Sequence, residues 1–325
     1  MCTLFSPDEF KSHRRFQLKA KSIYSLNIRT MPALNQLSAK YQERLNSTIP
    51  IQSYKLDSLS FEPGQLIIVG SRPGMGKSIF LMFMLQTFFE QSKDGFLFIS
   101  NEQTELKCFK NLACQVSSIS YSTIDQVMDE VISTHFKLLN SDRIFITFMR
   151  TAWEKQKEQI VAMVKQNSIK FLFIDKLQGL HTDHQYNNRD QELESILSDL
   201  KQIAFEYNLI IVAASSLSRS VEHREGKRPQ LSDLRCSGSI EEISDVVLML
   251  MRYEYYGITE DEDGNSLLDI AEIIISKNNL GPTSDMKFQF IKKIPQFKYF
   301  TEYQKMSFTK EFDRKYNSGG EHIPF

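Results

Sequence analysis

The stretch Leu66-Ile-Ile-Val-Gly-Ser-Arg-Pro-Gly-Met-Gly-Lys-Ser78 decides the fold of this chain. Its first four residues are apolar and predict a buried strand. The loop that follows leads to Gly76-Lys77-Ser78, the end of the pattern G-x-x-x-x-G-K-[ST], and the apolar run 79–89 predicts a helix. A strand, a glycine-rich loop and a helix in this order are typical of a phosphate-binding loop. The order argues against the alternative, a glycine-rich turn that carries Lys-Ser by chance.

The residue types of this loop suit a nucleotide. Gly70, Gly74 and Gly76 allow backbone N–H groups to turn toward an anion without interference from a Cβ atom, and the start of the helix adds partial positive charge. Lys77 is predicted to reach the β- and γ-phosphates of ATP, and the Ser78 hydroxyl to ligate Mg²⁺. The predicted ATP-binding residues are Ser71, Arg72, Pro73, Gly74, Met75, Gly76, Lys77 and Ser78.

Composition limits the class of protein. With 325 residues, the chain is long enough for one or two domains with a large core. No apolar run reaches the ~18 residues that a membrane span needs, the N-terminus does not resemble a signal peptide, and the four cysteines lack metal-ligand spacing. We therefore expect a cytoplasmic protein with reduced thiols and no membrane partner. Because the net charge is −1, a nucleic-acid site has to be local.

The first 50 residues form a separate region. They carry eight Lys/Arg and three acids, which is typical of a solvated arm, with contact to nucleic acid or a partner as the alternative. We assign 1–30 to a basic arm and 31–50 to a linker helix. The helix is predicted by an apolar stripe at helical spacing, Leu34, Leu37, Tyr41 and Leu45. So narrow a stripe has to cover its own domain or a neighbouring subunit, and we expect the neighbour.

From residue 60 onward, strands alternate with helices, which is typical of an α/β fold with a mostly parallel central sheet flanked by helices. The predicted strands are 66–69, 96–100, 143–148, 171–175, 209–214, 246–251, 273–276 and 286–291. The predicted helices are 79–89, 152–166 and 190–207, with further helical segments before 139. A long basic loop is expected over 215–235, a hairpin turn at 261–265 and a polar tail over 301–325.

Two acids stand at predicted strand ends. Asp175 closes an apolar strand, where nucleotide-binding sheets place the acid that holds Mg²⁺; a cap on the next turn is the alternative. Glu102 follows the strand 96–100, which can lie beside the strand 66–69 in this topology. Its carboxylate is then placed to orient and deprotonate the water that attacks the γ-phosphate. A solvated Glu at a strand end is the alternative.

Five segments in this order carry a resemblance: RPGMGKS (72–78), Ser-x-Glu (100–102), FIDKLQ (173–178), RPQLSDLRCSGSIEEISDVVLML (228–250) and IISKNNLGPTS (274–284). Together they resemble the C-terminal motor domain of replicative hexameric DNA helicases, the DnaB family. The similarity covers roughly residues 50–300, and the block RP-x-LSDLR-x-SG-x-IE is its most specific part. A RecA-type recombinase or a circadian-type ATPase shares the core but lacks this block.

The resemblance implies a RecA-like P-loop NTPase core over 51–300 that assembles as a ring, with a hexamer expected. It implies ATP sites between subunits and single-stranded DNA in the central channel. By resemblance, Lys77 and Ser78 hold Mg-ATP, Glu102 is the catalytic base, Asp175 is the magnesium acid, and Lys277 reaches into the neighbour's ATP site. The expected DNA-binding residues are Arg219, Arg224, Arg228, Arg235 and Gly238.

The sequence also departs from the family pattern. An arginine finger is expected two residues after Lys277, where this chain has Asn279, and Arg252 is a candidate substitute. Ser216 stands in place of a Gln that is thought to sense the γ-phosphate, Cys236 in place of an acid, and Lys176 in place of a Tyr. The collar domain through which family members bind primase is expected to be missing.

We therefore expect an ATP-dependent helicase or translocase of DnaB type that moves along single-stranded DNA in DNA replication. Its turnover is expected to be reduced without the arginine finger, since such fingers contribute ~10³–10⁵ in rate. The alternative is a weakly hydrolysing, ATP-binding assembly protein of a replication or mobile-element complex. Expected partners are single-stranded DNA, further copies of the chain, and a helicase loader or primase.

Overall fold

The computed structural model describes residues 53–261, 264–294 and 296–300. The predicted basic arm (1–30), linker helix with its apolar stripe (31–50) and tail (301–325) lie outside these residues. Within the described part, no helix is long and apolar enough to cross a membrane.

One large sheet organises the described residues. Its strands are β3 (Leu66–Ser71), β4 (Gly95–Ser100), β5 (Ile144–Phe148), β6 (Ile169–Asp175), β7 (Ile210–Ser216), β8 (Val246–Arg252), β9 (Ile270–Asn278), β10 (Asp285–Ile291) and β11 (Gln296–Lys298). They lie in the order β11-β10-β9-β8-β3-β7-β6-β4-β5. The strands from β8 to β5 pair in parallel, whereas β9, β10 and β11 extend the β8 edge in antiparallel fashion. A separate hairpin joins β1 (Tyr54–Leu56) to β2 (Leu59–Phe61).

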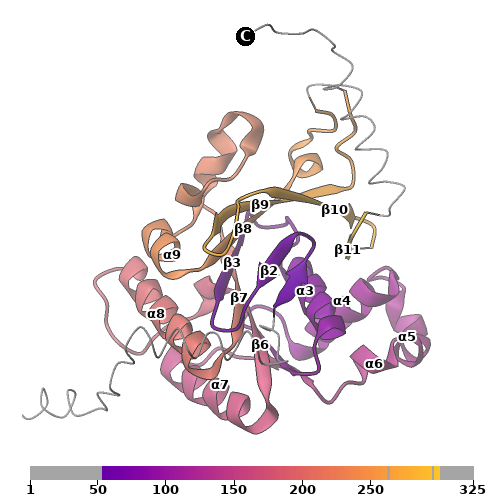
Figure 1. Ribbon diagram of the computed structural model, residues 1–325. Helices are drawn as coiled ribbons and strands as arrows, with labels where there is room; N and C mark the ends of the chain where they lie inside the picture. The colour runs from indigo at the N-terminus through magenta and orange to yellow at the C-terminus, as the bar shows by residue number, and fades with distance from the viewer. Residues whose placement is uncertain (1–52, 262–263, 295, 301–325) are drawn as a thin grey trace, which may run out of the picture. The chain divides into compact units, whose positions relative to one another are not determined.

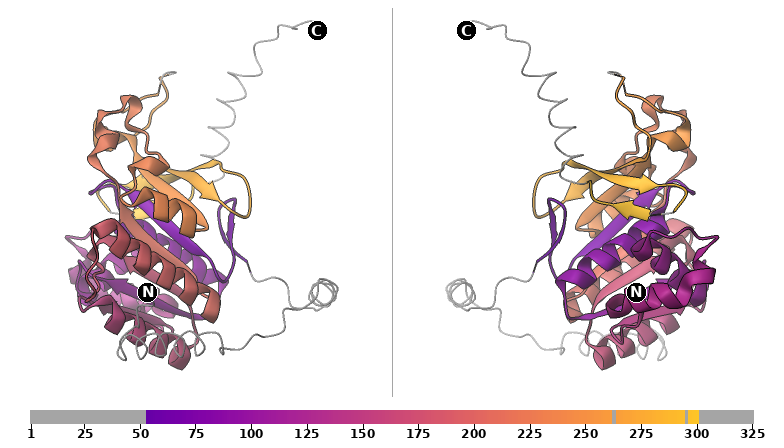
Figure 2. Two further views of the ribbon diagram at one scale, coloured as in Figure 1. Left: turned by 90° about the vertical axis from the view of Figure 1, so that its left-hand side faces the viewer. Right: turned by 90° about the vertical axis from the view of Figure 1, so that its right-hand side faces the viewer.

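Helices cover both faces of the sheet. The long helices are α3 (Lys77–Gln91), α4 (Glu105–Ser117), α7 (Trp153–Asn167) and α8 (Arg189–Tyr207). The side chains of β3 alternate between the faces: Ile67 and Val69 pack with the core under α3 and α4, and Leu66 and Ile68 with the core under α7 and α8. Figures 1 and 2 show the first helix pair, in violet and purple, on one face and the second pair, in pink and red, on the other. Because both faces are buried, the central strands are almost entirely apolar, as the sequence predicts.

Shorter elements complete the fold. The short helices are α5 (Met128–Thr134), α6 (Phe136–Leu139) and α9 (Ser237–Ile243). Turns of 3-10 helix are η1 (Ile124–Val127), η2 (Leu177–Gly179), η3 (Arg219–His223), η4 (Glu225–Lys227), η5 (Leu231–Asp233) and η6 (Tyr253–Tyr256). The predicted basic loop 215–235 therefore carries three 3-10 turns. An isolated bridge joins Glu260 to Ser266 across the predicted hairpin turn, of which residues 262 and 263 lie outside the described part.

The predicted fold class is confirmed, and each predicted strand is present with somewhat different ends. The sequence prediction missed the β1–β2 hairpin, β11 and α9, since strands of three residues and a helix of seven carry too little periodicity. One topological expectation was wrong. The strand that leads to Glu102, β4, does not lie beside β3, because β7 and β6 stand between them.

Candidate nucleotide-binding and catalytic site

The phosphate loop lies between β3 and α3, at the carboxyl edge of the parallel strands. Gly74 and Gly76 have φ angles of +82° and +101°, which side chains with a Cβ atom rarely adopt, and Gly76 is the N-cap of α3. Gly70 is required for a different reason: a Cβ atom there would stand 2.7 Å from the Met249 sulfur. The loop thus has the conformation that turns N–H groups toward an anion at a helix N-terminus.

Ser71 occupies the position where the strict pattern has its first glycine, because five residues rather than four separate Gly70 from Gly76. The φ angle of Ser71 is not positive, so glycine is not needed there. Instead, Lys77 Nζ donates to the Ser71 carbonyl (2.9 Å) and hydroxyl (3.1 Å). Burial, together with the nearby Lys176 ammonium, lowers the pKa of Lys77 to about 8. An anionic phosphate beside the Lys77 ammonium would raise this pKa again, because it stabilises the charged form.

Asp175 is the last residue of β6 and is buried. Burial raises the pKa of its carboxyl, and the nearby Glu102 carboxylate acts in the same direction, whereas a hydrogen bond from the Ser78 hydroxyl opposes the shift. Among the described residues, Asp175 Oδ2 has no hydrogen-bond partner. A buried, unpaired carboxylate oxygen beside a hydroxyl is a donor set that fits a hard divalent cation such as Mg²⁺.

Glu102 follows β4 and is about half exposed. Since β4 is the neighbour of β6, the Glu102 side chain meets Lys176, and Lys176 Nζ lies 2.6 Å from Glu102 Oε1. Glu102 also acts electrostatically on Lys77 and Asp175. The structure therefore brings the two predicted acids and the phosphate-loop lysine together, although Lys77 begins α3, Glu102 follows β4 and Asp175 ends β6.

Asn101 fixes the two acid-bearing segments against each other. Its backbone N–H donates to the Asp175 carbonyl (3.0 Å), and its side chain pairs with the Lys176 backbone through two hydrogen bonds of 2.7 and 3.2 Å. A Cβ atom at Gly179 would lie 2.1 Å from Asn101 Oδ1, so this close approach requires glycine. Sequence reasoning missed both Asn101 and the Lys176–Glu102 ion pair. The sequence shows that Asn101 and Glu102 follow one predicted strand and Lys176 another. It does not show that these two strands, β4 and β6, are neighbours in the sheet.

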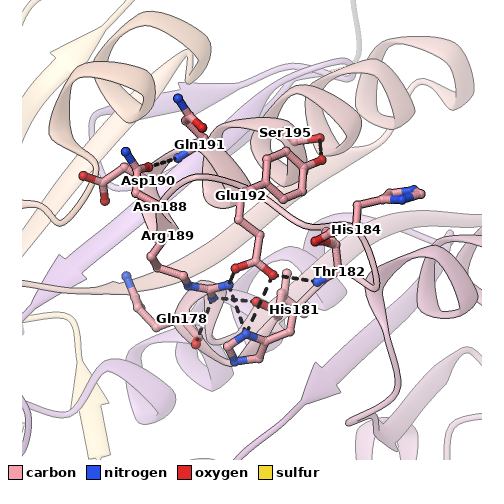
Figure 3. A network of polar contacts seen from close by, with 12 residues as sticks. Gln178, His181, Thr182, His184, Asn188, Arg189, Asp190, Gln191, Glu192 and Ser195 are labelled. Atoms are coloured by element: carbon pink, nitrogen blue, oxygen red, sulfur yellow. Dashed lines mark hydrogen bonds and ion pairs between the residues drawn. The ribbon is translucent and has the colours of Figure 1, made fainter.

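Gln178 links the Asp175 segment to the end of β7. Its amide donates to the Ser215 hydroxyl (2.9 Å) and accepts from the Ser216 backbone N–H (3.0 Å). Figure 3 shows how the following loop is held to the start of α8: Arg189 donates to the Gln178 carbonyl and pairs with Glu192, whose carboxylate also accepts from the Thr182 N–H. The position that the family pattern gives to a sensing Gln, Ser216, is thus fixed through its backbone.

Lys277 lies at the opposite edge of the sheet. The register aligns Lys277 with Val247 and Val247 with Ile68, about 10 Å along the strand before Ser71. The Lys277 ammonium donates to the carbonyls of Glu241 (2.6 Å) and Ser244 near the end of α9. Within one subunit, Lys277 is therefore remote from the phosphate loop.

The two positions considered for an arginine finger differ in exposure. Asn279 is exposed, and its backbone N–H donates to the Asp245 carbonyl. Arg252 is buried, pairs with Glu254 and stacks on the Phe290 ring at 3.8 Å. Its burial and these contacts argue against Arg252 as a substitute for the finger, because its guanidinium packs inside its own subunit.

The predicted DNA-binding arginines fall into two groups. Arg224 pairs with the buried Asp233 (2.8 Å), and Arg228 pairs with Glu272 (2.7 Å) and a second acid. Arg224 thus closes the 217–235 segment on itself, and Arg228 fastens the segment to β9 and β10.

Arg219 and Arg235 form the second group. Both are exposed, and within the described part of the chain neither has an ion-pair partner. A bridge between Leu217 and Leu234 brings their backbone segments together, and the exposed Gly238 follows shortly after. Among the predicted DNA-binding arginines that the structure describes, these two are the ones without an acid partner.

A parallel sheet with a glycine-rich loop, Lys77, Ser78 and a buried strand-end Asp175 defines a P-loop nucleotide-binding domain of the RecA-like class. The sequence model of the DnaB-like helicase C-terminal domain family matches residues 49–299, and the chain belongs to this family.

Individual relatives agree. The chain is 33% identical over 267 residues to "Replicative DNA helicase DnaB" of Mycoplasma pneumoniae, a match that covers 75% of this chain and 55% of that protein. It is 31% identical over 297 residues to "Probable replicative DNA helicase" of Trieres chinensis, covering 86% and 64%. The chain thus spans little more than half the length of these curated relatives.

Solved structures share the fold. A solved ATPase domain superposes with a TM-score of 0.72 and 26% identity, covering 82% of this chain and 98% of that one. "The Structure Of A DnaB-Like Replicative Helicase And Its Interactions With Primase" superposes with a TM-score of 0.71 at 23% identity, covering 90% and 78%, and supports the fold alone.

Proposed function

We propose that this chain is the motor of a DnaB-type helicase, which hydrolyses ATP at subunit interfaces and moves along single-stranded DNA during replication. The convergence of Lys77, Asp175 and Glu102 carries the proposal, since a phosphate ligand, a metal-binding acid and a base meet at one edge of the sheet. The helicase names of the relatives support the same function.

The proposed reaction is hydrolysis of ATP by water. Lys77 and the N–H groups of the phosphate loop bind the β- and γ-phosphates, and Ser78 and Asp175 hold Mg²⁺, which neutralises charge on the phosphates. Glu102 accepts a proton from the attacking water as the new bond to the γ-phosphorus forms. The bond from that phosphorus to the bridging oxygen breaks, and ADP leaves with the electron pair.

The proposed ring explains the position of Lys277. An ammonium at the amino edge of the sheet serves a nucleotide only if that nucleotide belongs to a neighbouring subunit. The proposal has four further parts. The ring is a hexamer, and DNA passes along Arg219, Arg235 and Gly238. A helicase loader or primase is a partner, and the protein is located in the cytoplasm.

Steady-state ATPase with and without single-stranded DNA tests the proposal. We expect Mg²⁺-dependent turnover that rises with DNA and is lost in Lys77→Ala, while circular dichroism shows an unchanged fold. Hydrolysis that persists in folded Lys77→Ala would rule out the site, and turnover indifferent to DNA would rule out the motor.

Asn279 favours a second function, an ATP-gated assembly protein that uses nucleotide to join subunits. A side chain without positive charge at this exposed position removes the guanidinium that would stabilise transition-state charge. Sedimentation of the intact chain with and without ATP measures assembly, and steady-state ATPase measures turnover. Assembly that requires ATP, together with no measurable turnover, would favour this function over the motor.

A further inference from the structure

Lys176 is a second ammonium at the nucleotide edge that the proposed mechanism does not use. Its Nζ lies 2.6 Å from Glu102 Oε1, and its side chain is 25% exposed. It is also close enough to act electrostatically on Lys77 and Asp175. Two ammonium groups and two carboxylates, those of Lys77, Lys176, Glu102 and Asp175, therefore act on one another at one site.

We propose that Lys176 contacts the terminal phosphate of ATP from within the same subunit, and that Glu102 holds the Lys176 side chain until the nucleotide arrives. This inference rests on the proposed nucleotide site, and it assigns to that site a cation which distinguishes ATP from ADP.

The backbone at Lys176 is built to hold a side chain in this place. Asn101 clamps the Lys176 N–H and carbonyl, and the Asp175 carbonyl accepts from the Asn101 N–H. The residue follows directly on the acid proposed to bind Mg²⁺, at the edge where the phosphate loop also lies. A flexible four-carbon stem on a fixed backbone lets the ammonium exchange one anionic partner for another without movement of the strand.

Charge provides the reason for the exchange. Without nucleotide, Lys176 and Glu102 neutralise each other. The terminal phosphate of ATP brings negative charge beside Lys77, and an ammonium in a partly buried site pairs more strongly with a phosphate that carries several negative oxygens than with one carboxylate. Transfer of Lys176 to the phosphate leaves the Glu102 carboxylate available to accept a proton from water.

The same contact offsets the missing arginine in part. Lys277 lies at the far edge of its own subunit, and position 279 carries no charge. An ammonium supplied by Lys176 in cis stabilises charge that develops on the transferred phosphoryl group, although it lacks the bidentate geometry of a guanidinium.

Equilibrium binding in a Glu102→Gln background tests the inference, because this background removes the ion pair and slows hydrolysis. We would titrate ATP and ADP, each with Mg²⁺, into Glu102→Gln and into Glu102→Gln/Lys176→Met. We expect the second change to weaken ATP binding at least tenfold and ADP binding less than twofold. Equal losses for both nucleotides, or no loss for ATP, would overturn the inference.

Lys170→Met in the same background is the matched control. Lys170 lies on β6 as well, at the other end of the strand, where its Nζ donates to the Tyr207 carbonyl (3.1 Å). We expect its ratio of ATP to ADP affinity to match the background. Failure of the proposed function looks different, since a wild-type chain that binds neither nucleotide would refute the site itself, whereas retained binding with an unchanged ratio would refute only the role of Lys176.

Discussion

The nucleotide edge and the 217–235 segment both concentrate charge, but they use it in opposite ways. At the nucleotide edge, Lys77 is partly buried with a lowered pKa, and Asp175 keeps an oxygen without a partner among the described residues. In the 217–235 segment, Arg224 and Arg228 are neutralised by acids of the same chain. A buried carboxylate oxygen without a partner marks a place for a cation, whereas arginines paired with acids of the same chain fasten a loop.

The largest effect that we expect from a substitution at the nucleotide edge is a loss of ATP turnover at Glu102. Glu102→Gln should keep ATP affinity and lose turnover by about 10²–10⁴-fold, the usual contribution of a general base. Binding titrations and steady-state ATPase measure the two quantities separately. An equal loss of ATP affinity and turnover would mean that Glu102 holds the nucleotide or the metal instead. The nucleotide edge would then lack an identified base.

The lowered pKa of Lys77 predicts a pH dependence. The anionic phosphate binds the protonated ammonium, so ATP affinity should be constant below the pKa of about 8 and fall roughly tenfold per pH unit above it. The terminal phosphate, with a second pKa of about 6, gains its last charge mostly below this range, so the fall in affinity above pH 8 does not come from it. Calorimetric titrations from pH 7 to pH 9.5 measure it. A flat affinity would show that Lys77 is not the ammonium that binds phosphate.

Asn279 offers a way to add charge from the opposite edge. Because this position is exposed and, among the described residues, contacts others through its backbone, Asn279→Arg should fold normally. If neighbours complete each site, the new guanidinium should raise DNA-stimulated turnover at least tenfold. Ser276→Arg, on the strand β9 that ends one residue before Asn279, is a suitable control and should not raise it. If the wild type already turns over rapidly and Asn279→Arg does not increase its rate, another cation already serves the site, as Lys176 is proposed to do.

The smallest expected effect separates the two groups of arginines. Arg235→Ala should weaken single-stranded DNA binding for every sequence and reduce the slope of log K against log salt by about 0.7, one phosphate contact. Arg224→Ala should leave that slope unchanged and lower the free energy of unfolding by about 1–3 kcal/mol, since Asp233 loses a buried partner. If Arg224→Ala reduced the salt slope and Arg235→Ala only destabilised the fold, Arg224 would be the DNA contact and Arg235 the structural residue.

Local sequence determined the α/β class, the phosphate loop and the acids at the strand ends. The apolar runs and glycines that specify them lie within a few residues of one another, where strand periodicity and backbone sterics act directly. The same holds for Lys77, Ser78 and Asp175, whose proposed roles rest on their positions at or shortly after the ends of strands.

Only the tertiary structure decided which charges are partnered. The sequence alone did not reveal that β6 lies beside β4, which joins Lys176 to Glu102, nor that Arg224 and Arg228 meet Asp233 and Glu272. It also did not reveal that the antiparallel β9 carries Lys277 to the far edge. The physical reason is that strand order and long-range ion pairs depend on how the entire sheet buries its two faces, and no local pattern contains that information.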